Sequence, residues 1–190
     1  MPAVADALRA LDAALRSAGA RWYLFGAQAA LIHGSSRLTA DVDATVAWKD
    51  ASRTAPLIAA LRAHGFVERQ VDADFVERTR VVPLEYAPTR IEVDLVLGGP
   101  GLEELFLSRA REHDIEGVRV PVATAEDLIA MKVLGGRPKD LDDVRALLAA
   151  NAGRLDLGHT RNVLAELESA LDRRDLLPAL DSALSDVAGR

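Results

Sequence analysis

Residues 25–45 read FGAQAALIHGSSRLTADVDAT, and this stretch decides the fold. An apolar run at residues 22–25 ends at Gly26, where a helix of small residues is expected to begin. A polar loop with two serines follows and leads into Asp41-Val42-Asp43, at the start of a second apolar run. We therefore expect a strand, a short helix, a loop and a second strand, in that order.

Two aspartates, Asp41 and Asp43, are two residues apart on the expected strand 41–47. Side chains two apart on a strand share a face, so both carboxylates lie together while Val42 points into the core. Unpaired carboxylates at such short range repel one another. Oxygen ligands without His or Cys favour Mg²⁺ or Mn²⁺, which are usually held by one or two carboxylates together with substrate phosphates. The pair therefore predicts a site for a divalent cation.

A third carboxylate, Asp94, lies on another expected strand, residues 90–97, among valine and leucine side chains. A carboxylate in such surroundings needs a partner. A metal ion shared with the first two aspartates would provide one, and so would a salt bridge to Arg80 or Arg90. The sequence alone leaves both possibilities open.

The composition limits the function further. The 190 residues suffice for one sizeable domain and a small helical region, and 49% hydrophobic with 27% charged residues is a globular balance. The net charge of −6 argues against general DNA binding. The absence of cysteine excludes disulfides and thiolate sites and fits a cytoplasmic location. We expect no signal peptide and no membrane contact, because no apolar run is long enough.

The order of expected elements predicts an α+β fold, with a mixed or antiparallel sheet flanked by helices over residues 1–122 and a helical region over 123–190. In residues 66–84 we expect two or three antiparallel strands, which Pro83 and Pro88 would confine to edges or turns. Asp50 is a candidate N-cap for a helix over 51–63. Thr124 and Asp127 resemble a capping box at the start of the helical region.

Five motifs resemble, in their order, those of the nucleotidyltransferase superfamily. They are Gly26-Ala27, SRLTADVD at 36–43, VDL at 93–95, DLIAMK at 127–132 and RPKDLDD at 137–143. Over roughly residues 20–150 the chain is similar to the AbiEii-type toxins of bacterial toxin–antitoxin and phage-defence pairs. The resemblance implies a nucleotidyltransferase-like sheet followed by a helical bundle. It also implies Mg²⁺ (or Mn²⁺), an NTP substrate, a cognate antitoxin and an RNA, such as tRNA, or a protein as acceptor.

Carried over residue by residue, the resemblance makes Asp41, Asp43 and Asp94 both metal ligands and catalytic residues. Asp94 would also take the proton of the acceptor hydroxyl. Gly26 and Ala27 match the turn whose N–H groups face the triphosphate, although the superfamily prefers Gly-Ser or Gly-Gly there. The other candidate nucleotide-binding residues are Ser36, Arg37, Thr39, Lys132, Arg137 and Lys139.

Each of these candidates also has a structural alternative. Lys132 could extend along an apolar helix face to reach solvent. Arg137 and Lys139 could complement a helix terminus, as Asp140 and Asp143 could at the start of the helix that follows. Loop serines are often turn formers.

The leading hypothesis is a Mg²⁺-dependent nucleotidyltransferase that moves NMP from an NTP to an acceptor hydroxyl and releases pyrophosphate, as the toxin of a toxin–antitoxin pair. Such a reaction needs positioning and neutralised phosphate charge more than covalent help from the protein. One alternative is the same reaction on an antibiotic of the aminoglycoside or lincosamide type. Another is an inactive binding module with this fold, which Ala27 would favour.

Overall fold

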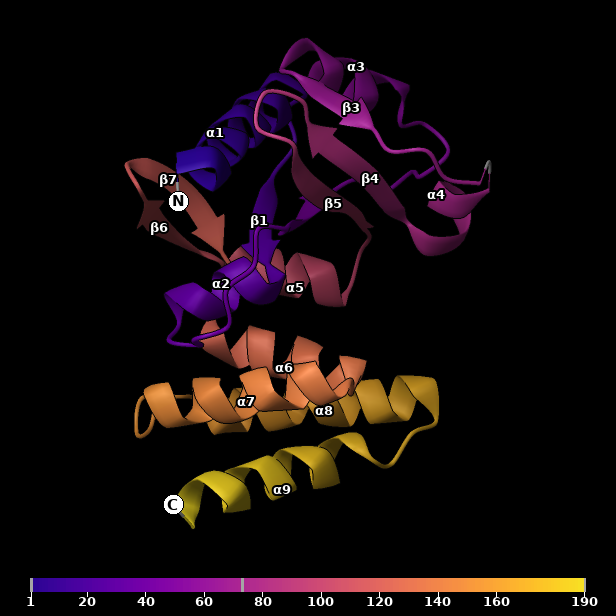
Figure 1. Ribbon diagram of the computed structural model, residues 1–190. Helices are drawn as coiled ribbons and strands as arrows, with labels where there is room; N and C mark the ends of the chain where they lie inside the picture. Colours follow the sequence, from indigo (N-terminus) through magenta and orange to yellow (C-terminus); the bar gives the residue numbers. More distant parts are fainter. Residues whose placement is uncertain (1, 73, 190) are drawn as a thin grey trace. The chain divides into compact units, whose positions relative to one another are not determined.

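The computed structural model describes residues 2–72 and 74–189 and confirms the α+β prediction (Figure 1). It divides into two compact units. The first comprises Met1–Gln28 and Thr39–Ala123, and the second comprises Ala29–Leu38 and Thr124–Arg190. Among the described residues, no helix has both the length and the apolar character needed to cross a bilayer.

In the described part of the first unit, seven strands form one sheet in the order β3-β4-β5-β2-β1-β7-β6 (Figure 1). The strands are β1 (Trp22–Phe25), β2 (Val42–Ala47), β3 (Phe66–Glu68), β4 (Val81–Tyr86), β5 (Ile91–Gly98), β6 (Arg111–Ile115) and β7 (Val118–Val122). The sheet is mixed, because the β2–β5 and β1–β7 pairs are parallel and the other pairs are antiparallel.

Helices pack on this sheet. They are α1 (Pro2–Ser17), α3 (Ala55–Ala63), α4 (Phe75–Thr79) and α5 (Leu102–Arg109), while α2 (Gly26–Ile32) begins in the first unit and ends in the second. The apolar stripe of α1 packs against β2, β5 and β7, and its leucines are fully buried. Burial of such a stripe is the main source of helix stability in a globular protein.

The central strands have one buried and one polar face. Val42 and Ala44 of β2 are buried, as are Val93 and Leu95 of β5, so these residues form the core face. The residues between them point to the opposite face, where part of β2 is covered by α5. The alternation expected for residues 90–97 is therefore present, and it leaves Asp94 outside the core.

The described part of the second unit contains four helices that pack together (Figure 1). They are α6 (Ala125–Gly135), α7 (Pro138–Ala150), α8 (Leu157–Leu171) and α9 (Leu176–Ala188). Thr124 caps α6 as predicted, since its side chain accepts a hydrogen bond from the Asp127 amide. The segment Ala29–Leu38 belongs to this unit, where the side chain of Asn151 donates to the carbonyl of His33 at 2.8 Å.

The region that starts at residue 66 forms two antiparallel strands, β3 and β4, within the predicted two or three, and the short helix α4 lies between them. Two local predictions were wrong. Pro83 lies inside β4, between β3 and β5, because β3 ends at Glu68 and only the Arg69 amide reaches the Pro83 carbonyl, at 2.9 Å. Asp50 does not cap α3, which begins after Thr54; its carboxylate accepts from Ser52 in the preceding turn.

Candidate active site

Two of the three predicted carboxylates are direct neighbours on the polar face of the sheet. Asp43 of β2 and Asp94 of β5 are paired in the parallel register, and both side chains are half-buried. Adjacent strands lie about 4.8 Å apart, and paired residues point to the same face. Asp41 comes just before β2 and is exposed. The structure thus brings Asp43 and Asp94 together across two strands that are separated by about fifty residues of chain.

Gly26 is packed against this pair. Its neighbour Phe25 pairs with Asp43 across β1 and β2, and Gly26 then starts α2 with φ +69°. A Cβ atom on Gly26 would lie 2.0 Å from Oδ2 of Asp43, closer than any nonbonded contact allows. The carboxylate of Asp43 therefore occupies the space of a missing side chain. This contact gives a physical reason for the glycine that the sequence motif contains.

The loop before β2 is tied to the start of α2. The side-chain amide of Gln28 donates to the Thr39 carbonyl at 2.7 Å, and the Asp41 amide donates to the Thr39 hydroxyl at 3.2 Å. Ala27, the second residue of the predicted phosphate turn, is buried. Thr39 therefore shapes the turn that leads into Asp41.

Asp94 has an arginine partner that the sequence did not suggest. Oδ1 of Asp94 accepts from Nη2 of Arg69, a residue just beyond β3. The two arginines expected as partners bind elsewhere. Arg80 donates to the carbonyls of Leu97 and Trp48, and Arg90 pairs with Glu85 at 3.0 Å. Nothing in the sequence around Arg69 marks it as a site residue.

The residues fit a divalent cation as a two-carboxylate site. Across residues 2–72 and 74–189, no three acidic, His or Cys side chains gather closely enough to enclose a metal ion. Mg²⁺ does not require such a cage, because substrate phosphates and water complete its coordination. Asp43 and Asp94 supply hard oxygen donors from adjacent strands. Asp41 lies two residues before Asp43, just before β2 begins. The donor set suits Mg²⁺ or Mn²⁺.

A second cluster lies entirely within the second unit and is centred on Asp143 of α7. Lys132 of α6 donates to Oδ2 of Asp143 at 2.7 Å, and Nη2 of Arg37 donates to the same oxygen at 2.9 Å. The hydroxyl of Ser35 donates to Oδ1 at 3.0 Å. Lys132 and Asp143 are both buried, so the lysine does not extend along the helix to reach solvent. Asp143 does not only place a charge near the start of α7, because it binds Lys132, Arg37 and Ser35.

The environment of Asp143 changes its acidity. Burial by itself would raise the pKa of this carboxyl group, but hydrogen bonds from Arg37 and Lys132 outweigh burial and lower the pKa to about 2. Asp143 is therefore a carboxylate at neutral pH and fixes both cations.

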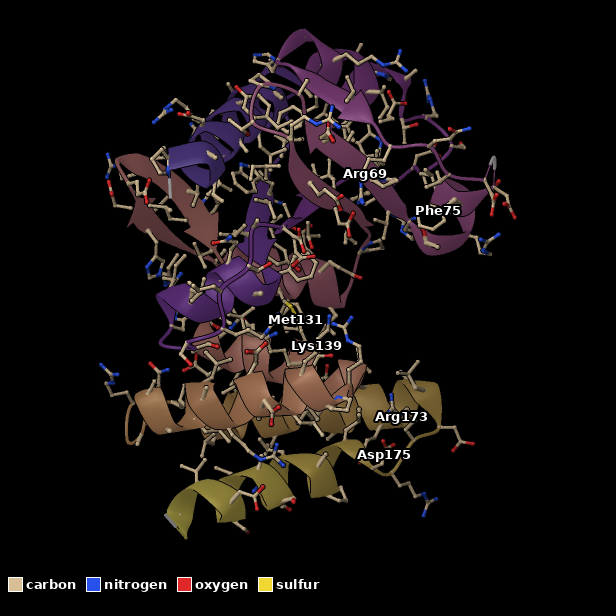
Figure 2. The ribbon with its side chains drawn as sticks, viewed as in Figure 1. Arg69, Phe75, Met131, Lys139, Arg173 and Asp175 are labelled. Carbon is tan, nitrogen blue, oxygen red and sulfur yellow. The ribbon has the colours of Figure 1, made fainter. Side chains whose placement is uncertain are left out.

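The remaining candidates differ in their surroundings. Arg137 pairs with Asp140 at the start of α7. Burial by itself would raise the pKa of Asp140, but the guanidinium of Arg137 outweighs burial and lowers the pKa. Lys139 (Figure 2) and Ser36 are exposed, and neither has a hydrogen bond or ion pair among the described residues. Ser35, rather than Ser36, is the loop serine that is bound to the Asp143 cluster.

Comparison with known proteins adds a family and a fold. Residues 9–188 match the family described as nucleotidyl transferase AbiEii toxin, type IV TA system. Comparison with curated protein sequences gives no match.

Three solved structures have a similar fold. An antigenic nucleotidyltransferase-like protein from Paracoccidioides brasiliensis is 17% identical with a TM-score of 0.57, and the match covers 95% of this chain and 93% of that chain. The solution structure of antibiotic-resistance factor ANT(2'')-Ia is 15% identical with a TM-score of 0.59, and the match covers 86% of this chain and 90% of that chain. The crystal structure of ANT(2'')-Ia with adenylyl-2''-tobramycin is 14% identical with a TM-score of 0.56, and the match covers 88% of this chain and 98% of that chain.

At such low identities the solved structures demonstrate a shared nucleotidyltransferase fold. The family match extends over nearly the whole chain and includes the paired aspartates, the glycine beneath them and the Asp143 cluster. This chain belongs to the AbiEii family of nucleotidyl transferase toxins of type IV toxin–antitoxin systems.

Proposed function

We propose that the chain is a Mg²⁺-dependent nucleotidyltransferase that attaches NMP from an NTP to an acceptor hydroxyl and releases pyrophosphate. The acceptor we propose is RNA, with tRNA as the first candidate. The observation that carries the proposal is the pairing of Asp43 with Asp94 beside the glycine that starts α2. This arrangement combines metal ligands with backbone N–H groups that can face phosphate.

The chain's own residues have defined tasks in this reaction. Asp43 and Asp94 would hold the divalent cation, which when bound neutralises charge on the α-phosphate and helps to align the reacting oxygens. Asp41, the exposed residue just before β2, stays a proposed third ligand. Asp94 would accept the proton of the acceptor hydroxyl as its oxygen attacks the α-phosphorus. The bond from the α-phosphorus to the bridging oxygen then breaks, and pyrophosphate leaves. The amides of Gly26 and Ala27 would donate to the triphosphate.

Arg37 and Lys132 stay proposed nucleotide-binding residues, as the family resemblance implies. Arg37 and Lys132 are fixed by one buried carboxylate, Asp143, so neither has to be ordered when a nucleotide binds. A preorganised cation loses little conformational entropy on binding phosphate. Arg137 and Lys139, both exposed, are proposed as outer contacts.

The antibiotic alternative has one supporting observation. The fold is similar to that of ANT(2'')-Ia, whose crystal structure contains adenylyl-2''-tobramycin. Membership of a toxin family favours a cellular acceptor over an antibiotic. A cognate antitoxin is part of the proposal for the same reason.

The test is an acceptor screen. Purified protein is incubated with each of the four α-labelled NTPs and Mg²⁺, together with total RNA, a protein extract or a panel of aminoglycosides and lincosamides. We expect labelled RNA, and we expect the Asp43→Asn variant to produce none. The matched control is Asp114→Asn, since Asp114 lies on the exposed strand β6 of the same sheet and, among the described residues, accepts only from the Gly117 amide of its own turn.

The outcomes separate the candidate functions. Labelled antibiotic with unlabelled RNA would favour the resistance-type alternative, and labelled protein would move the acceptor to that class. NTP binding without any transfer would favour the inactive binding module. Equal labelling of RNA by the wild type and Asp43→Asn would contradict the assignment of the site.

A further inference from the structure

A row of residues crosses the polar face of the sheet from Arg69 to Asp43. The Arg69 amide donates to the carbonyl of Pro83 at 2.9 Å, which continues the β3–β4 pairing by one residue. Pro83 pairs with Asp94 on β5, and Asp94 pairs with Asp43 on β2. Paired residues share a face, so Arg69 reaches Asp94 from the β4 side, opposite to the side on which Asp43 lies.

The guanidinium of Arg69 (Figure 2) binds two carboxylates on β5. Nη2 donates to Oδ1 of Asp94, and Nη1 donates to Oε2 of Glu92 at 2.7 Å. Glu92 and Asp94 are two residues apart, so both point to the polar face. Arg69 therefore connects the candidate catalytic carboxylate to a second acidic group and offsets part of their combined charge.

Arg69 makes these contacts while one of its own donors stays unsatisfied. Its Nε atom is buried, and among the described residues it has no hydrogen-bond partner. A buried donor without a partner is destabilising. The bonds from the two Nη atoms to Asp94 and Glu92 therefore form at a cost to the rest of the Arg69 side chain.

The contact leaves the second carboxylate oxygen of Asp94 available. Oδ1 is bound by Arg69, while Oδ2 has no hydrogen-bond partner in the described part of the chain. Groups behind a metal-binding carboxylate orient it, and their removal commonly weakens metal binding. We infer that Arg69 is a positioning residue that holds Asp94 so that its second oxygen and Asp43 bind the same divalent cation.

This inference rests on the proposed metal-dependent function, and its test has a readout other than activity. Mn²⁺ is titrated into the full-length protein in the absence of nucleotide, and binding is followed by the loss of the free-ion signal in electron paramagnetic resonance. We expect the Arg69→Gln variant to bind Mn²⁺ about 10- to 100-fold more weakly than the wild type. Arg69→Lys keeps the charge and restores part of the affinity.

Two controls make the result specific. Arg78→Gln removes a neighbouring exposed arginine whose partner is Asp74 in the same helical turn, and it should leave the affinity unchanged. In an Asp94→Asn background, Arg69→Gln should cause no further weakening, since the residue acts through Asp94. Circular dichroism checks that each variant is folded. If Arg69→Gln does not fold, Arg69→Lys decides the outcome, and we expect it to lose Mn²⁺ affinity in the same direction but by a smaller factor.

Several results would overturn the inference. Unchanged affinity in Arg69→Gln would make the contact purely structural. Tighter binding would show that the guanidinium competes with the cation for Asp94. Weakening that persists in the Asp94→Asn background would place the effect elsewhere. A wild type that binds no Mn²⁺ would overturn the proposed function itself, and this inference with it.

Discussion

A single hydrogen atom at Gly26 decides whether the carboxylate of Asp43 can lie where it does. The φ of +69° also favours glycine, because other residues are strained in the left-handed region. A side chain at Gly26 would therefore have two effects, backbone strain from the positive φ and a steric clash with Asp43. A second glycine in the chain allows the two effects to be measured separately. Gly19 has a nearly identical φ of +66°, with nothing within 4 Å of the position of its Cβ atom.

Gly26→Ala should therefore displace Asp43, whereas Gly19→Ala should only strain the backbone. Both changes should lower the free energy of unfolding by about 1 kcal/mol through the positive φ. Gly26→Ala should in addition abolish transfer activity and weaken Mn²⁺ binding. Paired measurements of denaturant unfolding and Mn²⁺ titration check this. If Gly26→Ala retains full metal affinity, the close packing of Asp43 on this glycine has no role in the site.

The paired aspartates were accessible to sequence reasoning because they lie on alternating strands. The pattern around Asp94 predicts a strand with one polar face, and Asp41-Val42-Asp43 predicts the other strand. Their parallel register was not predictable, since it depends on how the whole sheet assembles. Arg69 was missed because it is 25 residues from Asp94 in sequence and lies beside no motif.

At the scale of elements, one carboxylate joins three segments of the second unit. Asp143 of α7 binds Lys132 of α6 and also binds Arg37 and Ser35 of the segment Ala29–Leu38. The partners on that segment are 106 and 108 residues away in sequence, so no local pattern could reveal them. The motif 137–143 did include Asp143. Its sequence could not show whether Asp143 only places a charge near the start of a helix or is buried and binds several partners.

The stability of the second unit should therefore depend on pH in acid. Because the pKa of Asp143 is lowered from 3.8 to about 2 in the folded state, the unfolded state binds its proton first as the pH falls. The contribution is complete above about pH 5 and is lost progressively as the pH falls from about 5 through 2; it amounts to about 2 kcal/mol. Urea unfolding at a series of pH values between 6 and 2 measures it.

Substitution of Asp143 supplies the control for that experiment. Asp143→Asn removes the carboxylate that the buried ammonium of Lys132 hydrogen-bonds and leaves only Asp140, at 3.8 Å, so we expect a loss of about 3 kcal/mol at pH 6. Asp142→Asn, on the exposed neighbouring residue, should change stability by less than about 1 kcal/mol and keep the acid dependence. A wild type whose stability is flat between pH 4 and 2 would contradict the role of Asp143.

The strand and helix boundaries illustrate a second limit of sequence reasoning. Pro83 was expected at an edge, yet it lies inside the sheet where β3 has already ended and no partner needs its missing N–H. Proline is excluded from a strand by the neighbour at its own register position. That neighbour is known only after the strands are paired.

At the scale of the whole molecule, family membership and the proposed site point to one chemistry. The family match covers residues 9–188; the first unit contains the acidic pair, and the second contains the buried Lys132 and the partly exposed Arg37. Nucleotidyl transfer and kinase-type phosphoryl transfer both use such groups. They differ in the phosphorus atom that is attacked, and this difference can be measured.

The most direct measurement compares NTP labelled at the α-phosphate with NTP labelled at the γ-phosphate, using total RNA as acceptor and Mg²⁺ throughout. The account predicts that the α-label becomes attached to RNA while the γ-label is recovered in pyrophosphate. It also predicts that neither occurs with Asp43→Asn. Attachment of the γ-label to the acceptor, or equal transfer by wild type and Asp43→Asn, would contradict it.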